Sequence, residues 1–154
     1  MDSKNKIYTA SEVAKWFLAY NRKVMEEGDS EFISNLKLQK LLYYAQGTYY
    51  AITQQKLFND PIVAWRHGPV VESVYHEYKV YGSSGIEFKE AFDFDVFDPE
   101  TTSILEEVYD CFGQYSAWKL RNMTHDERPW KETNLNSVID AELIKSYFQE
   151  EYVE

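Results

Sequence analysis

The longest regular pattern in the chain predicts a helix that starts near residue 35. One of its faces repeats apolar residues at steps of three and four, and these are Leu38, Leu41, Leu42, Ala45, Tyr49 and Ile52. The other face is polar and aromatic, and it carries Gln39, Tyr43, Gln46, Gly47 and Tyr50. Tyrosine and glutamine can lie at a surface and still offer flat area and hydrogen bonds. We therefore expect a helix that Ser34 or Asn35 caps, with one buried face and one tyrosine-rich face. The second face either packs beneath another helix or, as the interpretation we adopt, is exposed as the floor of a binding groove.

Capping signals predict further helices on both sides of this one. Thr9 and Glu12 have the spacing of a capping box, and Gly28 with Asp29 is expected to end that first helix. Other helix starts are expected at Asp98, Ser116 and Asp140.

Short extended segments interrupt the helical patterns. Residues 62–66 form a run rich in β-branched and aromatic side chains, which ends at His67, Gly68 and Pro69. Pro69 suits the first position of another helix, and the alternation of apolar residues in 92–96 indicates one short strand. The sequence thus predicts one compact, mainly α domain over residues 1–154, a bundle of about six helices with one or two short extended segments.

Three motifs together resemble a known family. They are KLQKLLYYAQG at 37–47, AWRHGPVV with VYHEYKVYG about twenty residues later, and LRNMTHDERPW at 120–130. The combination is similar to the Panacea antitoxin domain family, which includes SocA-like antitoxins and phage-associated GepA-like proteins, and it spans nearly the whole chain. The resemblance implies a mainly helical antitoxin that neutralises a toxin encoded beside it by direct protein contact and catalyses no reaction.

At the positions that match the family, the resemblance implies either toxin contact or maintenance of the fold. A rigid turn that presents Trp and Arg has the composition of an interface hot spot, although the same Trp could fill the core and the Arg could pair with a carboxylate. The candidate partner-binding residues are Tyr43, Gln46, Tyr50, Trp65, Arg66 and His67. The candidate structural residues are Gly47, Gly68, Pro69, Thr124, His125, Pro129 and Trp130.

The charge distribution narrows the choice of partner. The formal net charge is -10, which disfavours direct binding of nucleic acid. Residues 85–115 hold nine acidic residues against one basic residue. This segment is either a solvated face or an acidic surface that meets a basic toxin or imitates nucleic acid.

Aromatic residues make up 17% of the chain, more than a core of this size needs, so we expect some of them at a binding surface.

Other features of the sequence favour a protein of the cytoplasm. The single cysteine, Cys111, cannot form an internal disulfide, and it is interpreted as a small core residue. The start of the chain has no apolar signal region and no apolar run approaches membrane-spanning length.

Signals for catalysis or cofactor binding are weak. His67, His76 and His125 lack the spacing of metal ligands, and no phosphate loop or nucleophile motif occurs, so we expect no metal, cofactor or catalytic residue. Two alternatives to the antitoxin hypothesis stay open. One is an adaptor that delivers a partner to a cytosolic protease, and the other is a hydrolase built on histidines and carboxylates. A homodimer is also left open.

Overall fold

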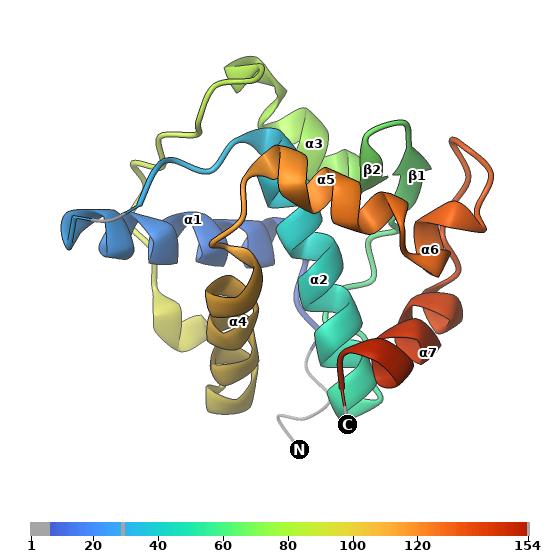
Figure 1. Ribbon diagram of the computed structural model, residues 1–154. Coiled ribbons are helices and arrows are strands. Elements are labelled where there is room, and N and C mark those ends of the chain that lie inside the picture. Colours follow the sequence, from blue (N-terminus) through green and yellow to red (C-terminus); the bar gives the residue numbers. More distant parts are fainter. Residues whose placement is uncertain (1–6, 29, 154) are drawn as a thin grey trace.

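Helix α2, Asn35–Thr53, runs through the middle of the structure, and the other elements surround it (Figure 1). The computed structural model describes residues 7–28 and 30–153. The remaining α-helices of this part are α1 Ala10–Glu26, α3 Glu72–Glu77, α4 Pro99–Phe112, α5 Ala117–His125, α6 Arg128–Lys131 and α7 Ala141–Glu151. Strands β1 Val63–Trp65 and β2 Gly68–Val70 form one antiparallel hairpin. The prediction of a mainly helical fold with few extended residues is confirmed.

The predicted caps begin their helices. Thr9 Oγ1 accepts from the backbone N–H of Glu12, and Glu12 Oε1 accepts in turn from the N–H of Thr9, which completes the capping box. Asp98, Ser116 and Asp140 each cap the helix that follows with a side-chain oxygen. Helix α1 ends at Glu26, just before the predicted stop at Gly28, which has φ +106°. The other half of that predicted stop, Asp29, lies outside the described residues, and so do residues 1–6, where no signal region was expected.

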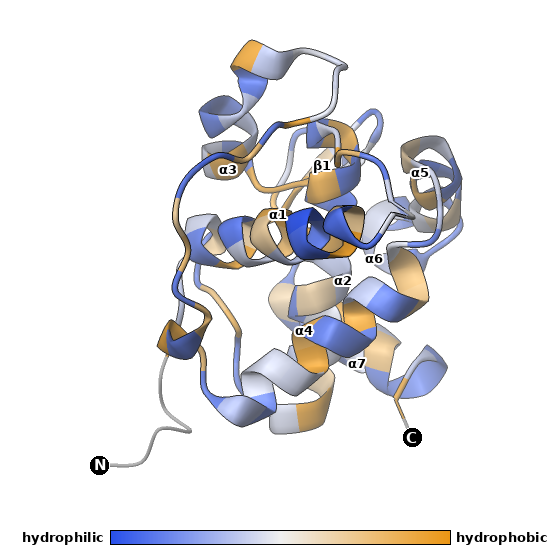
Figure 2. Ribbon diagram, turned by 90° about the vertical axis from the view of Figure 1, so that its left-hand side faces the viewer, coloured by the Kyte–Doolittle hydropathy of each residue, from blue (hydrophilic) through white to orange (hydrophobic). Residues whose placement is uncertain are grey.

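Most residues of helix α2 are buried, on every face of the helix and not on one face only. It contacts α1, α3, α4, α5, α7 and β2, so the face that was expected to be exposed is covered as well. Helix α1 shows the other behaviour, because its ribbon changes between hydrophobic and hydrophilic residues within each turn (Figure 2). The expectation for Ile52 is also wrong, since this residue in the last turn of α2 is 42% exposed.

The hairpin departs from the predicted turn between strand and helix. Pro69 lies in β2 opposite Ala64, and the next helix begins only at Glu72. Proline is tolerated there because β2 lies at the edge of a two-stranded sheet. The other edge of β1 pairs with a segment before α7, where the N–H of Ala64 donates to the carbonyl of Ser137 at 2.9 Å. The hairpin therefore contacts both the central helix α2, through β2, and the segment before α7, through β1.

The predicted short strand in 92–96 is wrong. Phe94–Val96 forms a single turn of 3-10 helix, η3, in which the side chain of Asp93 accepts from the N–H of Asp95 at 2.9 Å. This local hydrogen bond offers the backbone an alternative to strand pairing. In the part of the chain that the structure covers, no helix is long and apolar enough to cross a membrane.

A buried carboxylate joins α2 to the C-terminal helices. Glu127 is 3% exposed, and its oxygens accept from the hydroxyls of Tyr43, Tyr44 and Tyr152. Burial raises the pKa of Glu127, and the three hydroxyl donors oppose this rise. The same burial and the nearby carboxylate raise the pKa of Tyr43. This cluster fixes α7 and the α5–α6 junction against the central helix.

Substitution of Tyr43 should therefore lower stability before it affects any surface. Removal of the hydroxyl in Tyr43→Phe leaves Glu127 with one donor fewer, which we expect to cost about 1–3 kcal/mol of unfolding free energy. Tyr43→Ala also opens a cavity and should cost roughly 3–5 kcal/mol. Urea unfolding followed by circular dichroism measures both losses, with Tyr115→Phe, at a half-buried tyrosine outside this cluster, as the control. Wild-type stability of Tyr43→Ala would contradict the buried position.

Candidate functional site

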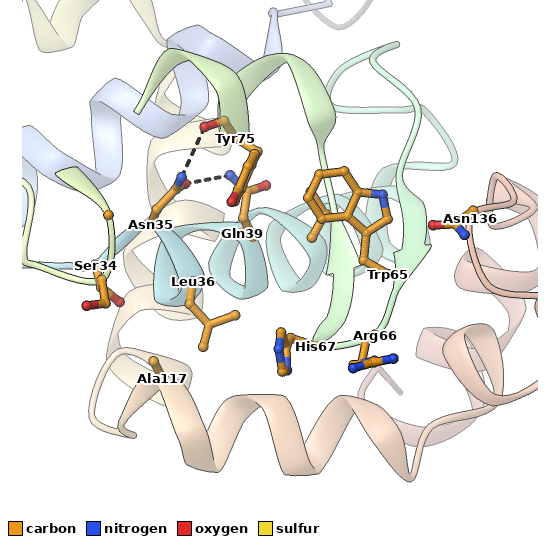
Figure 3. Close-up of a pocket in the computed structure, with 13 residues that line it drawn as sticks. Ser34, Asn35, Leu36, Gln39, Trp65, Arg66, His67, Tyr75, Ala117 and Asn136 are labelled. Carbon is orange, nitrogen blue, oxygen red and sulfur yellow. Dashed lines mark hydrogen bonds between the residues drawn. The ribbon is translucent and has the colours of Figure 1, made fainter. Parts of the chain in front are cut away.

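The tip of the hairpin closes one end of a cavity of about 600 Å³. We call this cavity the hairpin groove, and among the residues that line it are Leu36, Trp65, Arg66, His67, Val70 and Tyr75. These side chains come from the start of α2, the hairpin and α3, while α5 closes the opposite side (Figure 3). The groove thus has a largely apolar floor and a polar tip.

A ladder of side-chain amides fixes the wall of the groove. Asn35 donates to the carbonyl of Tyr75 at 3.0 Å, and Gln39 donates to Asn35 Oδ1 at 2.9 Å (Figure 3). The oxygen of Gln39 accepts from the N–H of Val71 at 2.9 Å. Both amides are buried and satisfied, so they hold the chain between β2 and α3 at a defined position on α2.

Trp65 is half-buried and presents its ring to the groove. Its indole packs edge-to-face on Tyr75 with 4.9 Å between ring centroids, and its Nε1 donates to Glu72 at 3.2 Å. The carbonyl of Trp65 accepts from the indole N–H of Trp130 at 2.7 Å. The ring is therefore held rigidly while part of it stays exposed, as an interface anchor requires.

The neighbouring tip residues are exposed and basic. His67 Nδ1 accepts from the Nε of Arg121 on α5 at 3.3 Å, and the guanidinium of Arg121 lies 4.4 Å from the ring centroid of Trp118. Arg66 and His67 are both exposed at the end of the hairpin. This arrangement offers planar donors and a cation beside an apolar cavity, which is chemistry suited to binding.

A buried lysine lies directly beneath the hairpin. Lys40 is fully buried on α2, and its Nζ donates to the carbonyl of Pro69 at 3.1 Å. Gly68 has φ +115°, and a Cβ at this position would lie 2.6 Å from Lys40 Cε and 2.9 Å from Thr124 Oγ1. Burial, with the charge of Arg121 as a second cause, lowers the pKa of Lys40 to about 7. Only glycine allows the hairpin to approach this closely.

The structure brings together half of the predicted partner-binding residues. Trp65, Arg66 and His67 meet at the groove, and their role in partner binding stays a prediction. The expectation that Tyr43, Gln46 and Tyr50 lie at a surface is wrong, because they are 0%, 4% and 8% exposed.

Each of the three misplaced residues serves the interior. Tyr43 donates to Glu127, Gln46 bonds the backbone of Leu57 and Phe58, and Tyr50 donates to Glu142. A period of 3.6 residues marks which side chains share a face, but it does not show whether a second layer of helices covers that face.

The candidate structural residues occupy packed positions. A Cβ on Gly47 would overlap the ring of Phe148 on α7. Thr124 is fully buried, and its hydroxyl donates to the carbonyl of Arg121 at 2.8 Å. His125 stacks on Trp130 with 3.9 Å between ring centroids, and burial and the nearby cations lower the pKa of His125. Pro129 is buried in the first turn of α6.

Two cationic side chains that contact the hairpin were not found from the sequence. Lys40 and Arg121 did not stand out, because long cationic side chains usually extend to solvent. Lys40 does fall at helical spacing with Leu36, Tyr44 and Gly47, which is the available signal that it belongs to a buried face.

The interpretation of Cys111 as a core residue is wrong, since it is exposed on α4. Among the described residues, no group of three or more His, Cys, Asp and Glu side chains is arranged to hold a metal ion.

Comparison with known families defines the class of this protein. The family described as antitoxin SocA-like, Panacea domain, matches residues 38–131. The chain therefore belongs to this antitoxin family, as its motifs indicated.

A characterised relative gives a more particular likeness. Antitoxin SocA of Caulobacter vibrioides (strain NA1000 / CB15N) is 32% identical over 110 residues, which cover 64% of this chain and 58% of the relative. The chain thus spans less than two thirds of that relative's length. No solved structure matches the chain.

The buried Lys40 predicts an unusual dependence of stability on pH. Because its pKa falls from 10.5 to about 7 on folding, the unfolded chain binds more protons between these values, and stability should rise with pH across that window. The slope should reach at most about 1.4 kcal/mol per pH unit. In Lys40→Met most of this rise should be lost, and what remains in the upper part of the window comes from Lys37, whose pKa burial also lowers. Urea unfolding at intervals from pH 6 to 10 measures the difference.

The control is Lys23→Met, at an exposed lysine in the last turn of α1. It should keep the pH dependence of the wild type. If Lys40→Met keeps it as well, Lys40 is not the titrating group.

Proposed function

We propose that this protein neutralises a toxin encoded beside it by binding the toxin directly through the hairpin groove, as a stoichiometric partner in the cytoplasm and without catalysing a reaction. Membership in the antitoxin family and the name of the relative, antitoxin SocA, support the role. The observation that carries the proposed surface is the rigid tip with Trp65, Arg66 and His67 beside an apolar cavity.

The mechanism that fits this surface is occlusion. A partly exposed Trp that is immobilised by hydrogen bonds and ring packing loses little entropy on binding. Exposed cations at the rim add orientation and partner selection. When a segment of the toxin is seated in the groove, the antitoxin would cover the active surface of the toxin. This mechanism needs no reactive group from the antitoxin.

The acidic segment provides a second element of the proposal. Its carboxylates in 85–115 are exposed, apart from the half-buried Asp98, which caps α4 and accepts from the hydroxyl of Tyr8 at 2.8 Å. Helix α4 lies on another side of α2 from the hairpin (Figure 1). Attraction of a basic toxin by this segment would therefore act beside the groove and not within it.

Rescue of growth tests the proposed surface. The neighbouring gene is expressed with the wild type or with Arg66→Ala plus His67→Ala, and we expect the double variant to lose at least about tenfold in surviving cells, because truncation of contact residues at an interface weakens binding. Both side chains are exposed, so the melting temperature should stay near that of the wild type.

The matched control is His76→Ala plus Lys79→Ala, which removes one histidine and one cation from exposed positions near α3. Full rescue by the folded Arg66 and His67 variant would contradict the groove as the contact surface. The toxin level, followed by immunoblot, separates two mechanisms. A constant level with rescue supports occlusion, whereas a fall that depends on this protein indicates delivery to a protease. If no neighbouring gene arrests growth, the proposed function is wrong.

A further inference from the structure

A second cavity adjoins the hairpin groove at Arg66. Its volume is about 450 Å³, and Arg66 lines both cavities. Arg121, His125 and Lys131 also line it, so we call it the basic cavity. The apolar groove and the basic cavity form one continuous surface around the hairpin tip.

The cations of this surface have no carboxylate partner in residues 7–28 and 30–153. The ion pairs within these ranges join Lys15 to Glu77, Lys89 to Glu87 and Arg128 to Glu150. Glu72, at the start of α3, accepts from the indole N–H of Trp65 at 3.2 Å.

Basic groups act on one another here although the chain as a whole carries -10. Arg121 lies against His67, and its charge acts on both Lys40 and His125. Cations held this close together repel one another, and an incoming anion relieves that repulsion. No carboxylate of the described residues forms an ion pair with these cations, so a binding partner would have to supply the negative charge.

Apolar anchors flank the cations on either side. Trp118 is 57% exposed and carries the guanidinium of Arg121 on its ring. Leu135, which is 55% exposed, lines the basic cavity, and Trp65 lines the groove. An occupant of this surface has to offer apolar side chains next to negative charge.

We propose that the hairpin groove and the basic cavity together bind an acidic segment of a protein partner, with an apolar or aromatic side chain in the groove and neighbouring carboxylates on Arg66 and Arg121. This inference rests on the proposed function, since the partner is the toxin and the surface is the same. The inference goes further than the proposed function because it specifies which side chains the bound toxin segment would carry. Guanidinium groups match carboxylates in a planar, two-point geometry, which favours Asp and Glu side chains as the ligands.

Nucleic acid fits this surface less well than an acidic peptide. A phosphate backbone presents charge along its whole length and would meet the surrounding acidic surface of a chain with net charge -10. The cations of the hairpin tip are confined to one spot beside apolar side chains. A short acidic segment with an apolar residue uses both features.

Labelled peptides test the charge preference without knowledge of the toxin. The probes are fluorescein-labelled, C-terminally amidated decapeptides with a central Trp-Leu pair flanked by Asp and Glu, by Asn and Gln, or by Lys. A fourth probe is a labelled single-stranded oligonucleotide. Fluorescence anisotropy with the full chain should show the acidic peptide binding at least about tenfold more tightly than the neutral one, and added salt should reduce this difference.

Charge reversal identifies the residues responsible. Arg66→Glu, at an exposed position, should abolish the preference for the acidic peptide. Lys89→Glu makes the same change of charge in the 85–98 segment and should leave the preference intact. In two-dimensional NMR spectra of the wild type, the acidic peptide should shift the amide of Arg66 and the indole signals of Trp65 and Trp118.

Each contrary result overturns a defined part of the inference. Equal binding of acidic and neutral peptides, or an unchanged preference in Arg66→Glu, removes the carboxylate site, and tighter binding of the oligonucleotide replaces it with a nucleic-acid surface. If the peptides show no preference while Arg66→Ala plus His67→Ala still loses rescue, the proposed function stands and only the charge preference is wrong. If the peptides bind as expected but no neighbouring gene is toxic, the charge preference stands and the proposed function is wrong.

Discussion

Enclosure of α2 on every side is the constraint on which the rest of the structure depends. A helix in this position has to satisfy each of its polar side chains internally, because an unpaired buried polar group is costly. Gln39 bonds the start of α3, Gln46 bonds the 57–58 backbone, and Lys40 bonds the hairpin. Each partner belongs to a different segment, so the hydrogen bonds of one helix fix where the surrounding elements lie.

The groove follows from this arrangement. Lys40 and Thr124 leave no room for a side chain at Gly68, so the hairpin rests directly on α2 and α5 and only its tip projects. The buried ammonium has the carbonyl of Pro69 as acceptor and feels the charge of Arg121, which is a destabilising position for a cation. The buried Lys40 thus lowers the stability of the fold, but its hydrogen bond fixes the position of the hairpin that carries Trp65, Arg66 and His67.

Local rules in the sequence accounted for α1, α2, α4, α5 and α7 and their N-caps, whereas the start of α3, the short α6 and the site depended on tertiary packing. The capping box at Thr9 and the aspartates and serine before α4, α5 and α7 act within four residues, so sequence alone sufficed. Tyr43 could not be placed in this way, because its burial results from α7 and from Glu127, which lie far along the chain. Pro69 fitted either a helix start or an edge strand, and the closeness of Lys40 and Ser137 to the hairpin decided between them.

The separation of charge over the molecule limits what kind of partner fits. Exposed acids are concentrated on α4 and the segment before it, whereas Arg66, Arg121 and Lys131 lie together beside the hairpin, where Glu72 is the exposed acid that bonds Trp65. Screening limits each field to about 8–10 Å at physiological salt, so the two regions act on different parts of a bound protein. A wholly acidic partner would be repelled by the acidic surface, and a wholly basic one by the hairpin tip. The proposed partner that would match both regions is a basic protein with its few acidic residues in one segment beside an apolar side chain.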